Sequence, residues 1–227
     1  MREVAAVATP MYRSKADTAY SSLKRFLDFI IALAAILALS PIMALVAIVV
    51  AIDTKGSPIF VQERMGRHSV PFKIYKFRSM SVHAPANVAT HKLENADQYI
   101  SRIGHLIRKT SLDELPQLIN VLKGDMSFVG PRPVVLSERD LIRLRRRNGA
   151  DRVRPGITGL AQVSGRDTVT IREKARYDAQ YAKSYSFKAD LSILFKTAKQ
   201  VVVSEGVVEG ANKSISANPH HKMRRSA

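Results

Sequence analysis

The sequence predicts a mainly α-helical protein with one small β-hairpin, in which a re-entrant membrane helix and interfacial amphipathic helices surround a compact cytosolic domain. Three observations lead to this fold class: an uncharged apolar run over residues 29–52, several segments with helical spacing of apolar residues, and β-like runs between Gly56 and Met80. A chain of 227 residues suffices for one domain with a real core. We divide it into a flexible leader (1–22), one membrane-associated domain (23–203) and a disordered tail (204–227).

The charge balance points to anionic partners. The chain has 36 Lys and Arg against 19 Asp and Glu, a formal net charge of +17. Such a charge favours nucleic acid, anionic lipid or a phosphate-rich substrate without choosing among them. The absence of cysteine excludes disulfides, thiolate metal sites and a cysteine nucleophile.

The apolar run over 29–52 has about 24 residues and reaches roughly 36 Å as a helix, enough to cross a bilayer core. Taken alone, such a run favours a simple spanning anchor. However, Ser40-Pro41 near its middle predicts a bend, because proline removes one helical hydrogen bond. Basic residues flank both ends, including Lys24 and Arg25 before the run and Lys55 after it. Because basic flanks favour the cytoplasmic side, we predict a re-entrant helix, with a crossing helix as the alternative.

The rest of the chain shows no second span. We expect a hairpin with a Gly66 turn within 56–80, a mobile loop over 81–97, and interrupted helix over 98–123. Further helices are predicted at 136–148 and 171–185, with a Gly- and Pro-rich loop at 154–166. The apolar spacing from Phe187 to Val203 predicts an amphipathic helix that lies in the membrane interface or packs on the core.

The adjacent carboxylates Asp113 and Glu114 follow the basic residues Arg108 and Lys109. Ser111 and Glu114 match the S-x-x-E capping box, so the local motif by itself favours a helix start. Carboxylates at such a start remain ionised. An ionised Asp is then a competent nucleophile on phosphorus, and an ionised Glu a ligand for Mg²⁺. The two interpretations are compatible.

Basic residues in stiff or glycine-rich segments form the candidate phosphate site. Arg132 stands between Pro131 and Pro133, which restrict the backbone and pre-order the guanidinium. Arg154 precedes Pro155-Gly156 in a similar arrangement. Lys76 and Arg78 are either further phosphate ligands or charges on the face of a strand. The six histidines show no metal-ligand spacing, and we predict no catalytic role for them.

Four stretches in this order, KFRSM, RKTSLDELPQ, GDMSFVGPRP and RPGITGLAQVSGR, stand behind an apolar run broken by Ser-Pro. Together they resemble the bacterial sugar transferase family, the small monotopic polyprenyl-phosphate phosphoglycosyl transferases. The resemblance extends from about Leu23 to Val203.

The resemblance implies a catalytic domain on the cytoplasmic face of the bacterial inner membrane. Asp113 would attack the sugar-proximal phosphate of a UDP-sugar, release UMP and carry the phosphosugar as an aspartyl ester. Undecaprenyl phosphate would then accept the sugar phosphate, which initiates exopolysaccharide or other glycoconjugate synthesis. Glu114 would help to hold Mg²⁺. Arg132 and Arg154, and less directly Arg108 and Lys76, match positions near the phosphates or uridine.

The sugar and the oligomeric state stay open. Members similar to this chain use UDP-N-acetylhexosamines or UDP-galactose or UDP-glucose; we predict an N-acetylhexosamine, with a hexose as the alternative. A membrane-tethered basic module for nucleic acid is the alternative of another class, motivated by the net charge and by Arg145-Arg146-Arg147. No recognition motif supports it, and we predict no nucleic-acid partner.

Overall fold

The computed structural model describes residues 15–85, 96–165 and 169–203, so most of the predicted leader and all of the predicted tail lie outside it. Helix α1 (Lys15–Thr54) has 40 residues and begins within the stretch predicted as a leader. At 1.5 Å per residue it is about 60 Å long, twice the thickness of a bilayer core. Within the described ranges, α1 is the one helix that is long and apolar enough to cross a membrane.

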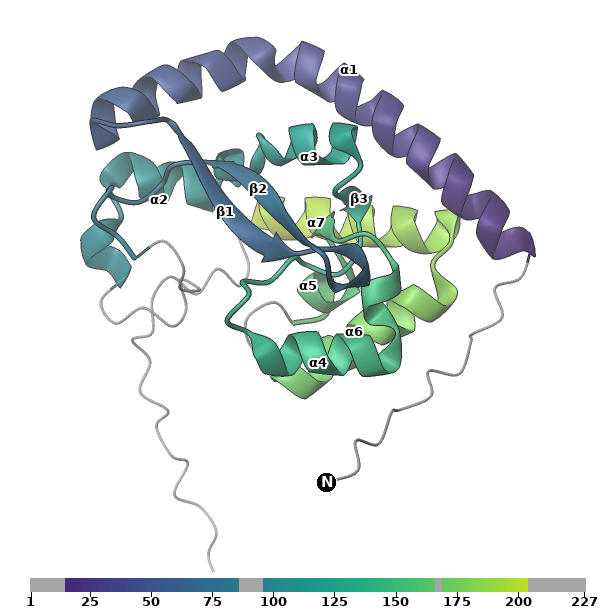
Figure 1. The fold of residues 1–227 in the computed structure, drawn as a ribbon. Coiled ribbons are helices and arrows are strands. Elements are labelled where there is room, and N and C mark those ends of the chain that lie inside the picture. The colour runs from purple at the N-terminus through teal and green to yellow at the C-terminus, as the bar shows by residue number, and fades with distance from the viewer. Residues whose placement is uncertain (1–14, 86–95, 166–168, 204–227) are drawn as a thin grey trace, which may run out of the picture.

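Helix α1 is curved and arches over the rest of the molecule (Figure 1). It continues through the predicted break at Ser40-Pro41. Pro41 has no N–H to donate to the Leu37 carbonyl, four residues back. The Ser40 hydroxyl takes this place and donates to the Leu37 oxygen at 2.9 Å. The Ser-Pro pair therefore interrupts the hydrogen-bond ladder while keeping the exposed carbonyl satisfied.

Both halves of α1 pack on the same body. In the N-terminal half, Ala32 is fully buried in one core cluster, and in the C-terminal half Val46 and Val50 are buried in another. The first cluster contains Ile74, Val121 and Met126, and the second Phe77 and Ile107. The other side of the helix exposes a row of large apolar side chains, namely Phe29, Ile30, Ile31, Leu33, Leu37, Ile42, Leu45, Ile48 and Ile52.

The predicted hairpin is confirmed. Strand β1 (Ile59–Met65) pairs antiparallel with β2 (Pro71–Phe77), and Phe60 lies opposite Lys76. A short 3-10 turn, η1 (Arg67–Ser69), joins them. Gly66 precedes this turn, where a Cβ would lie 2.8 Å from the Val70 carbonyl oxygen. The turn therefore requires glycine.

The region predicted as interrupted helix contains α2 (Arg102–Lys109), the 3-10 turn η4 (Leu112–Glu114) and α3 (Gln117–Lys123). Another 3-10 turn, η3 (Ala96–Tyr99), precedes them. Most of the loop predicted over 81–97 lies outside the described residues.

The loop predicted at 154–166 is wrong. Strand β3 (Ser127–Val129) pairs in parallel with β4 (Gly156–Thr158), and α5 (Leu160–Gly165) follows. A Cβ at Gly156 would lie 2.1 Å from the Gly130 backbone nitrogen. The glycines that suggested a loop instead allow two backbones to approach closely.

Three longer helices complete the domain. Helix α4 (Arg139–Asn148) begins three residues later than predicted, and η5 (Ala150–Arg152) follows it. Helix α6 (Ile171–Ser184) matches its prediction and starts with a capping box between Thr170 and Glu173. Helix α7 (Phe187–Val203) buries Asp190 and Ile193 but exposes an apolar face of Phe187, Leu191, Leu194 and Phe195.

Asp190 of α7 connects its own helix to α1 and α6 through hydrogen bonds. Its Oδ2 accepts hydrogen bonds from Tyr20 at 2.8 Å and from Lys24 at 2.6 Å, both on α1. Its Oδ1 accepts one from Tyr181 of α6 at 2.8 Å. The start of α1 is thereby fixed against the C-terminal helices.

Candidate active site

The acidic pair lies in η4, between α2 and α3. Ser111 ahead of it adopts a left-handed conformation, with φ of 57°, and turns the chain sharply after α2. Asp113 is buried, with 9% of its surface exposed. The Glu114 side chain is 17% exposed. The turn therefore holds two neighbouring carboxylates largely away from solvent.

Two cations meet at Glu114. Lys76 Nζ from β2 and Arg132 Nη2 each donate to Glu114 Oε1 at 2.8 Å. Burial by itself would raise the pKa of Glu114, but the charges and hydrogen bonds of Arg132 and Lys76 outweigh it. The pKa of Glu114 is therefore well below its ordinary value, and this carboxylate is ionised at neutral pH.

For Asp113, the influences that raise the pKa outweigh those that lower it. Burial raises its pKa, and the neighbouring Glu114 charge adds to this, while Lys76, Arg108 and Arg132 oppose it. Lys76 Nζ lies 3.9 Å from Asp113 Oδ2, too far for a hydrogen bond but close enough for electrostatic attraction. The Asp113 carboxylate is thus less stabilised than its neighbour, a property of a group poised to react.

The predicted capping box at this place is wrong. The Ser111 side chain makes no capping hydrogen bond, because its left-handed backbone directs the turn differently. Glu114 receives its proton donors from the side chains of Lys76 and Arg132, which come from distant parts of the sequence. Ionisation of Glu114 therefore depends on tertiary contacts rather than on a capping box.

The backbone around Arg132 is held from both sides. Pro131 and Pro133 are buried, whereas the Arg132 side chain is 47% exposed. Arg145 Nη1 donates to the Arg132 carbonyl oxygen at 2.9 Å. Arg145 in turn forms a buried ion pair with Asp178, at 2.7 Å between Nη2 and Oδ2. The chain from Asp178 through Arg145 fixes the segment that presents Arg132 to Glu114.

Arg145 and Asp178 were missed by sequence reasoning. Arg145 falls one helical turn after buried Leu141, so its spacing would have placed it on the inner face of α4. Its burial also divides the run Arg145-Arg146-Arg147, which had motivated the nucleic-acid alternative: only Arg146 and Arg147 of the three are exposed.

Arg64 is a further residue that the sequence did not single out. Its Nη1 donates to the Pro133 carbonyl oxygen at 3.4 Å. Burial, with repulsion from Arg132, lowers the pKa of Arg64 to about 10, partly offset by attraction to Glu138 and Glu114. Arg64 thus supports the same segment from β1.

Two predicted phosphate ligands lie elsewhere. Arg154 Nε donates to the Gly124 carbonyl at 2.9 Å, at the end of α3 opposite to the acidic pair. Arg78 Nε donates to the Ser57 carbonyl at 2.8 Å, and its guanidinium stacks over Phe60. The structure therefore brings Lys76, Arg108 and Arg132 to the acidic pair, but not Arg154.

The acidic pair has limited capacity for a metal ion. Within the described residues there is no group of three or more His, Cys, Asp or Glu side chains arranged to hold one. Oε1 of Glu114 already accepts from two cations, which leaves Oε2. Such a site suits Mg²⁺ only where substrate phosphates and water supply most of the ligands, as is common for this ion.

Comparison with known proteins identifies the family. The model of the bacterial sugar transferase family matches residues 19–204. The chain belongs to the bacterial sugar transferase family. The match covers every described element except the first few residues of α1.

Individual relatives of this bacterial sugar transferase differ in length. It is 43% identical to the UDP-galactose-lipid carrier transferase of Erwinia amylovora, over 81% of this chain and 41% of the relative. It is 39% identical to the exopolysaccharide production protein ExoY of Sinorhizobium fredii, over 81% of this chain and 87% of the relative.

A third relative, from Aeromonas hydrophila, is named UDP-N-acetylgalactosamine-undecaprenyl-phosphate N-acetylgalactosaminephosphotransferase. It is 37% identical over 82% of this chain and 45% of the relative. The chain therefore spans less than half the length of some relatives and most of the length of ExoY.

Proposed function

We propose that this protein transfers a sugar 1-phosphate from a UDP-sugar to undecaprenyl phosphate and releases UMP. The observation that carries the proposal is the placement of Lys76 between the two carboxylates, 2.8 Å from Glu114 and 3.9 Å from Asp113, beside Arg132. The name of the Aeromonas hydrophila relative, which contains both a UDP-sugar and undecaprenyl phosphate, supports it.

Asp113 acts as the nucleophile. One carboxylate oxygen attacks the sugar-proximal phosphorus, the bond from this phosphorus to the oxygen shared with UMP breaks, and UMP leaves with the electron pair. An oxygen of undecaprenyl phosphate then attacks the same phosphorus and displaces Asp113 as a free carboxylate. Both steps join anions, so the cations Lys76, Arg108 and Arg132 offset the repulsion.

Glu114 orients the cations. By holding Lys76 and Arg132 at one oxygen, it keeps both charges beside Asp113. Its other oxygen would hold Mg²⁺ together with the diphosphate of the substrate. The ion supplies charge neutralisation of the diphosphate when it is bound.

A single-leaflet placement in the membrane fits the fold. Because both halves of α1 are docked on one body, a crossing would require one of them to detach from its core cluster. We propose that the outer face of α1 enters the membrane and returns to the same side, with the bend at Ser40-Pro41 at its deepest point. The exposed apolar face of α7 would rest in the same interface.

The absence of cysteine makes this placement testable. Single cysteines at Ser22 and Ser57, near the two ends of the apolar segment, are treated with a membrane-impermeant maleimide in intact cells and in inverted vesicles. We expect both to be modified in inverted vesicles alone. Modification of one of them in intact cells would demonstrate a crossing helix.

The transfer itself is tested with a panel of UDP-sugars, undecaprenyl phosphate and Mg²⁺, scored by UMP release. The panel contains N-acetylhexosamines, which we predicted from the sequence, and galactose and glucose as the alternative. Asp113→Asn should abolish UMP release, whereas Asp140→Asn, on the exposed side of α4, should not alter it. Full turnover by Asp113→Asn would exclude the nucleophile.

The covalent step has its own measurement. Without undecaprenyl phosphate, the wild-type protein should release at most one equivalent of UMP and gain the mass of a sugar phosphate. Asp113→Asn should show neither. Steady UMP release without acceptor, or strict dependence of the first UMP on the acceptor, would contradict the aspartyl ester.

A further inference from the structure

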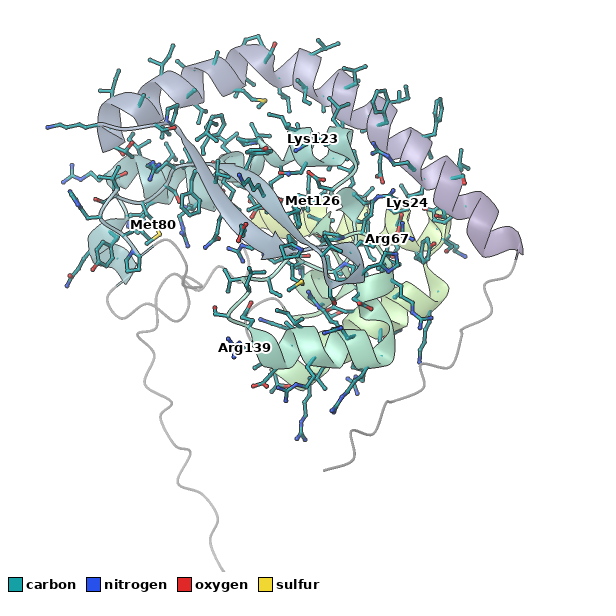
Figure 2. All side chains as sticks on the ribbon, in the orientation of Figure 1. Lys24, Arg67, Met80, Lys123, Met126 and Arg139 are labelled. Carbon is teal, nitrogen blue, oxygen red and sulfur yellow. The ribbon has the colours of Figure 1, made fainter. Side chains whose placement is uncertain are left out.

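A second concentration of positive charge lies away from the acidic pair, under the N-terminal half of α1. A small cavity lies there, lined by five basic residues, one acidic residue and Ser127, and is called the basic cavity below. Its basic residues are Lys24, Arg25, Arg67, Arg152 and Arg154. Figure 2 shows Lys24 and Arg67 on the inner side of α1, far from Arg139 on α4.

The cavity collects these residues from three parts of the chain. Lys24 and Arg25 come from α1, Arg67 from the turn between β1 and β2, and Arg152 and Arg154 from the segment before β4. Burial lowers the pKa of Arg154, and repulsion by the charges of Arg67 and Arg25 lowers it further. Like charges held together in partly buried positions favour a bound anion.

Carboxylates inside the protein offset part of this charge. Asp190 pairs with Lys24, and Asp28 accepts a hydrogen bond from the Phe128 backbone at 3.3 Å. Arg25 and Arg154 donate to carbonyl groups at the end of α3. Within the described residues, the Arg67 side chain makes a hydrogen bond only from Nε, to the Arg152 carbonyl. Its terminal nitrogens thus remain for a ligand.

A buried hydroxyl supplies an independent indication of a ligand. Ser127 is 1% exposed and lines the cavity, and its Oγ has no hydrogen-bond partner within the described part of the chain. A buried polar group without a partner destabilises the folded protein, so an occupant that bonds to it is favoured. Arginine forks and a hydroxyl together match the oxygens of a phosphate.

Size and position narrow the choice of occupant. The cavity is small, with a volume of about 30 Å³, so it has no room for a whole nucleotide. The acidic pair precedes α3 and the Gly124 contact of Arg154 follows it, so about 10 Å of helix separates the two centres. A phosphate in the basic cavity is therefore not the one that reacts at Asp113.

We propose that the basic cavity binds the phosphate of an anionic lipid headgroup. Phe29 of α1 and Leu191 of α7 are exposed near the cavity and belong to the faces assigned above to the membrane interface. The choice of a lipid as the source rests on that placement. Binding would hold the N-terminal arm of α1 at headgroup level independently of catalysis.

The test uses the full chain in a nonionic detergent, without UDP-sugar, so an error in the transferase assignment leaves its result intact. Thermal unfolding is followed with inorganic phosphate or with dihexanoyl phosphatidylglycerol, each against sodium chloride at equal ionic strength. We expect both phosphates to raise Tm saturably, the lipid at lower concentration. Equal or tighter binding of inorganic phosphate would overturn the lipid as the source.

The variants locate the site. Arg67→Gln/Arg152→Gln should raise the half-saturating concentration at least tenfold. Arg139→Gln/Arg143→Gln removes two exposed charges from α4 and should not change it. An equal effect of both pairs, or reproduction of the Tm rise by sodium chloride, would overturn the proposal.

Ser127→Ala provides a second test in case the double arginine variant does not fold. It removes only the hydroxyl without a partner, so the protein should be at least as stable without ligand. Its phosphate affinity should fall severalfold. Unchanged affinity in Ser127→Ala, together with unchanged affinity in any folded Arg67 variant, would count against the cavity.

Discussion

Arg145 donates from Nη1 to the carbonyl oxygen of Arg132 at 2.9 Å, so one arginine fixes the backbone of another. The first is buried and bound to Asp178, and the second is half exposed and contacts Glu114. A structural ion pair is thereby linked to the candidate active site through a single hydrogen bond.

We predict that Arg145→Lys lowers kcat/KM by about tenfold, because lysine keeps the charge opposite Asp178 but lacks the planar fork that reaches both partners. Arg146→Lys, at the exposed neighbouring position, is the matched control and should be near wild type. The readout is UMP release normalised to the folded fraction. If activity falls only in proportion to the folded fraction, Arg145 has no positioning role.

The adjacent carboxylates should affect stability with opposite signs. Glu114→Gln is expected to lower the free energy of unfolding at neutral pH by about 2 kcal/mol, since Lys76 and Arg132 lose their shared anion. The lowered pKa of Glu114 means that this stabilisation is complete above the pKa of the unfolded chain and declines in acid.

Asp113→Asn is expected to raise Tm at neutral pH. Because burial raises the pKa of Asp113, the folded state binds its proton more tightly than the unfolded state does, and stability is lost as pH rises through the folded pKa. The amide removes that cost. Thermal unfolding of both variants at neutral pH decides the matter: a lower Tm for Asp113→Asn would contradict the electrostatic assignment.

The pH dependence of activity should report the same carboxyl. The nucleophile must be ionised, so kcat/KM should fall on acidification at a higher pH than for an ordinary Asp, whose pKa is about 3.9. Lys76→Gln removes a charge that lowers the pKa of Asp113, so it should shift this fall further upward and slow the reaction. Lys73→Gln, exposed on the same strand, should leave the profile in place.

The bend of α1 should depend on its Ser-Pro pair. Pro41→Ala restores the N–H that bonds to the Leu37 carbonyl and favours a straight helix, which cannot contact both core clusters. We expect lower Tm and a fraction of chains with Ser22→Cys modified from outside intact cells. Ser40→Ala alone should have a smaller effect. A fully wild-type labelling pattern in Pro41→Ala would show that packing alone sets the bend.

Regular patterns made most of the fold predictable. The β-like runs on either side of Gly66 identified the hairpin, and apolar spacing identified α7. The pairing of β3 with β4 was not predictable, because strands of three residues are too short to show a period, and Gly156 resembles a loop residue.

Asp113, Glu114, Lys76 and Arg132 were all singled out from the sequence, but their mutual contacts were not. Lys76 and Arg132 meet Glu114 across 38 and 18 positions of the chain, which no local pattern records. Arg154 was grouped with Arg132 because both precede or follow proline, yet it binds the far end of α3. Neighbouring prolines show that the backbone of an arginine is restricted, but they do not show which part of the fold its side chain contacts.

The hydrogen bond from Lys24 to Asp190 can form only late in the synthesis of the chain. The two residues are 166 positions apart, so α1 leaves the ribosome before its anchor on α7 has been made. At 5–20 residues per second, the start of α1 waits about 10 to 30 s for that contact. The outer apolar face of α1 is exposed even in the finished domain, so lipid or a chaperone must shield it from the beginning, and membrane insertion would precede completion of the domain that later holds the helix in place.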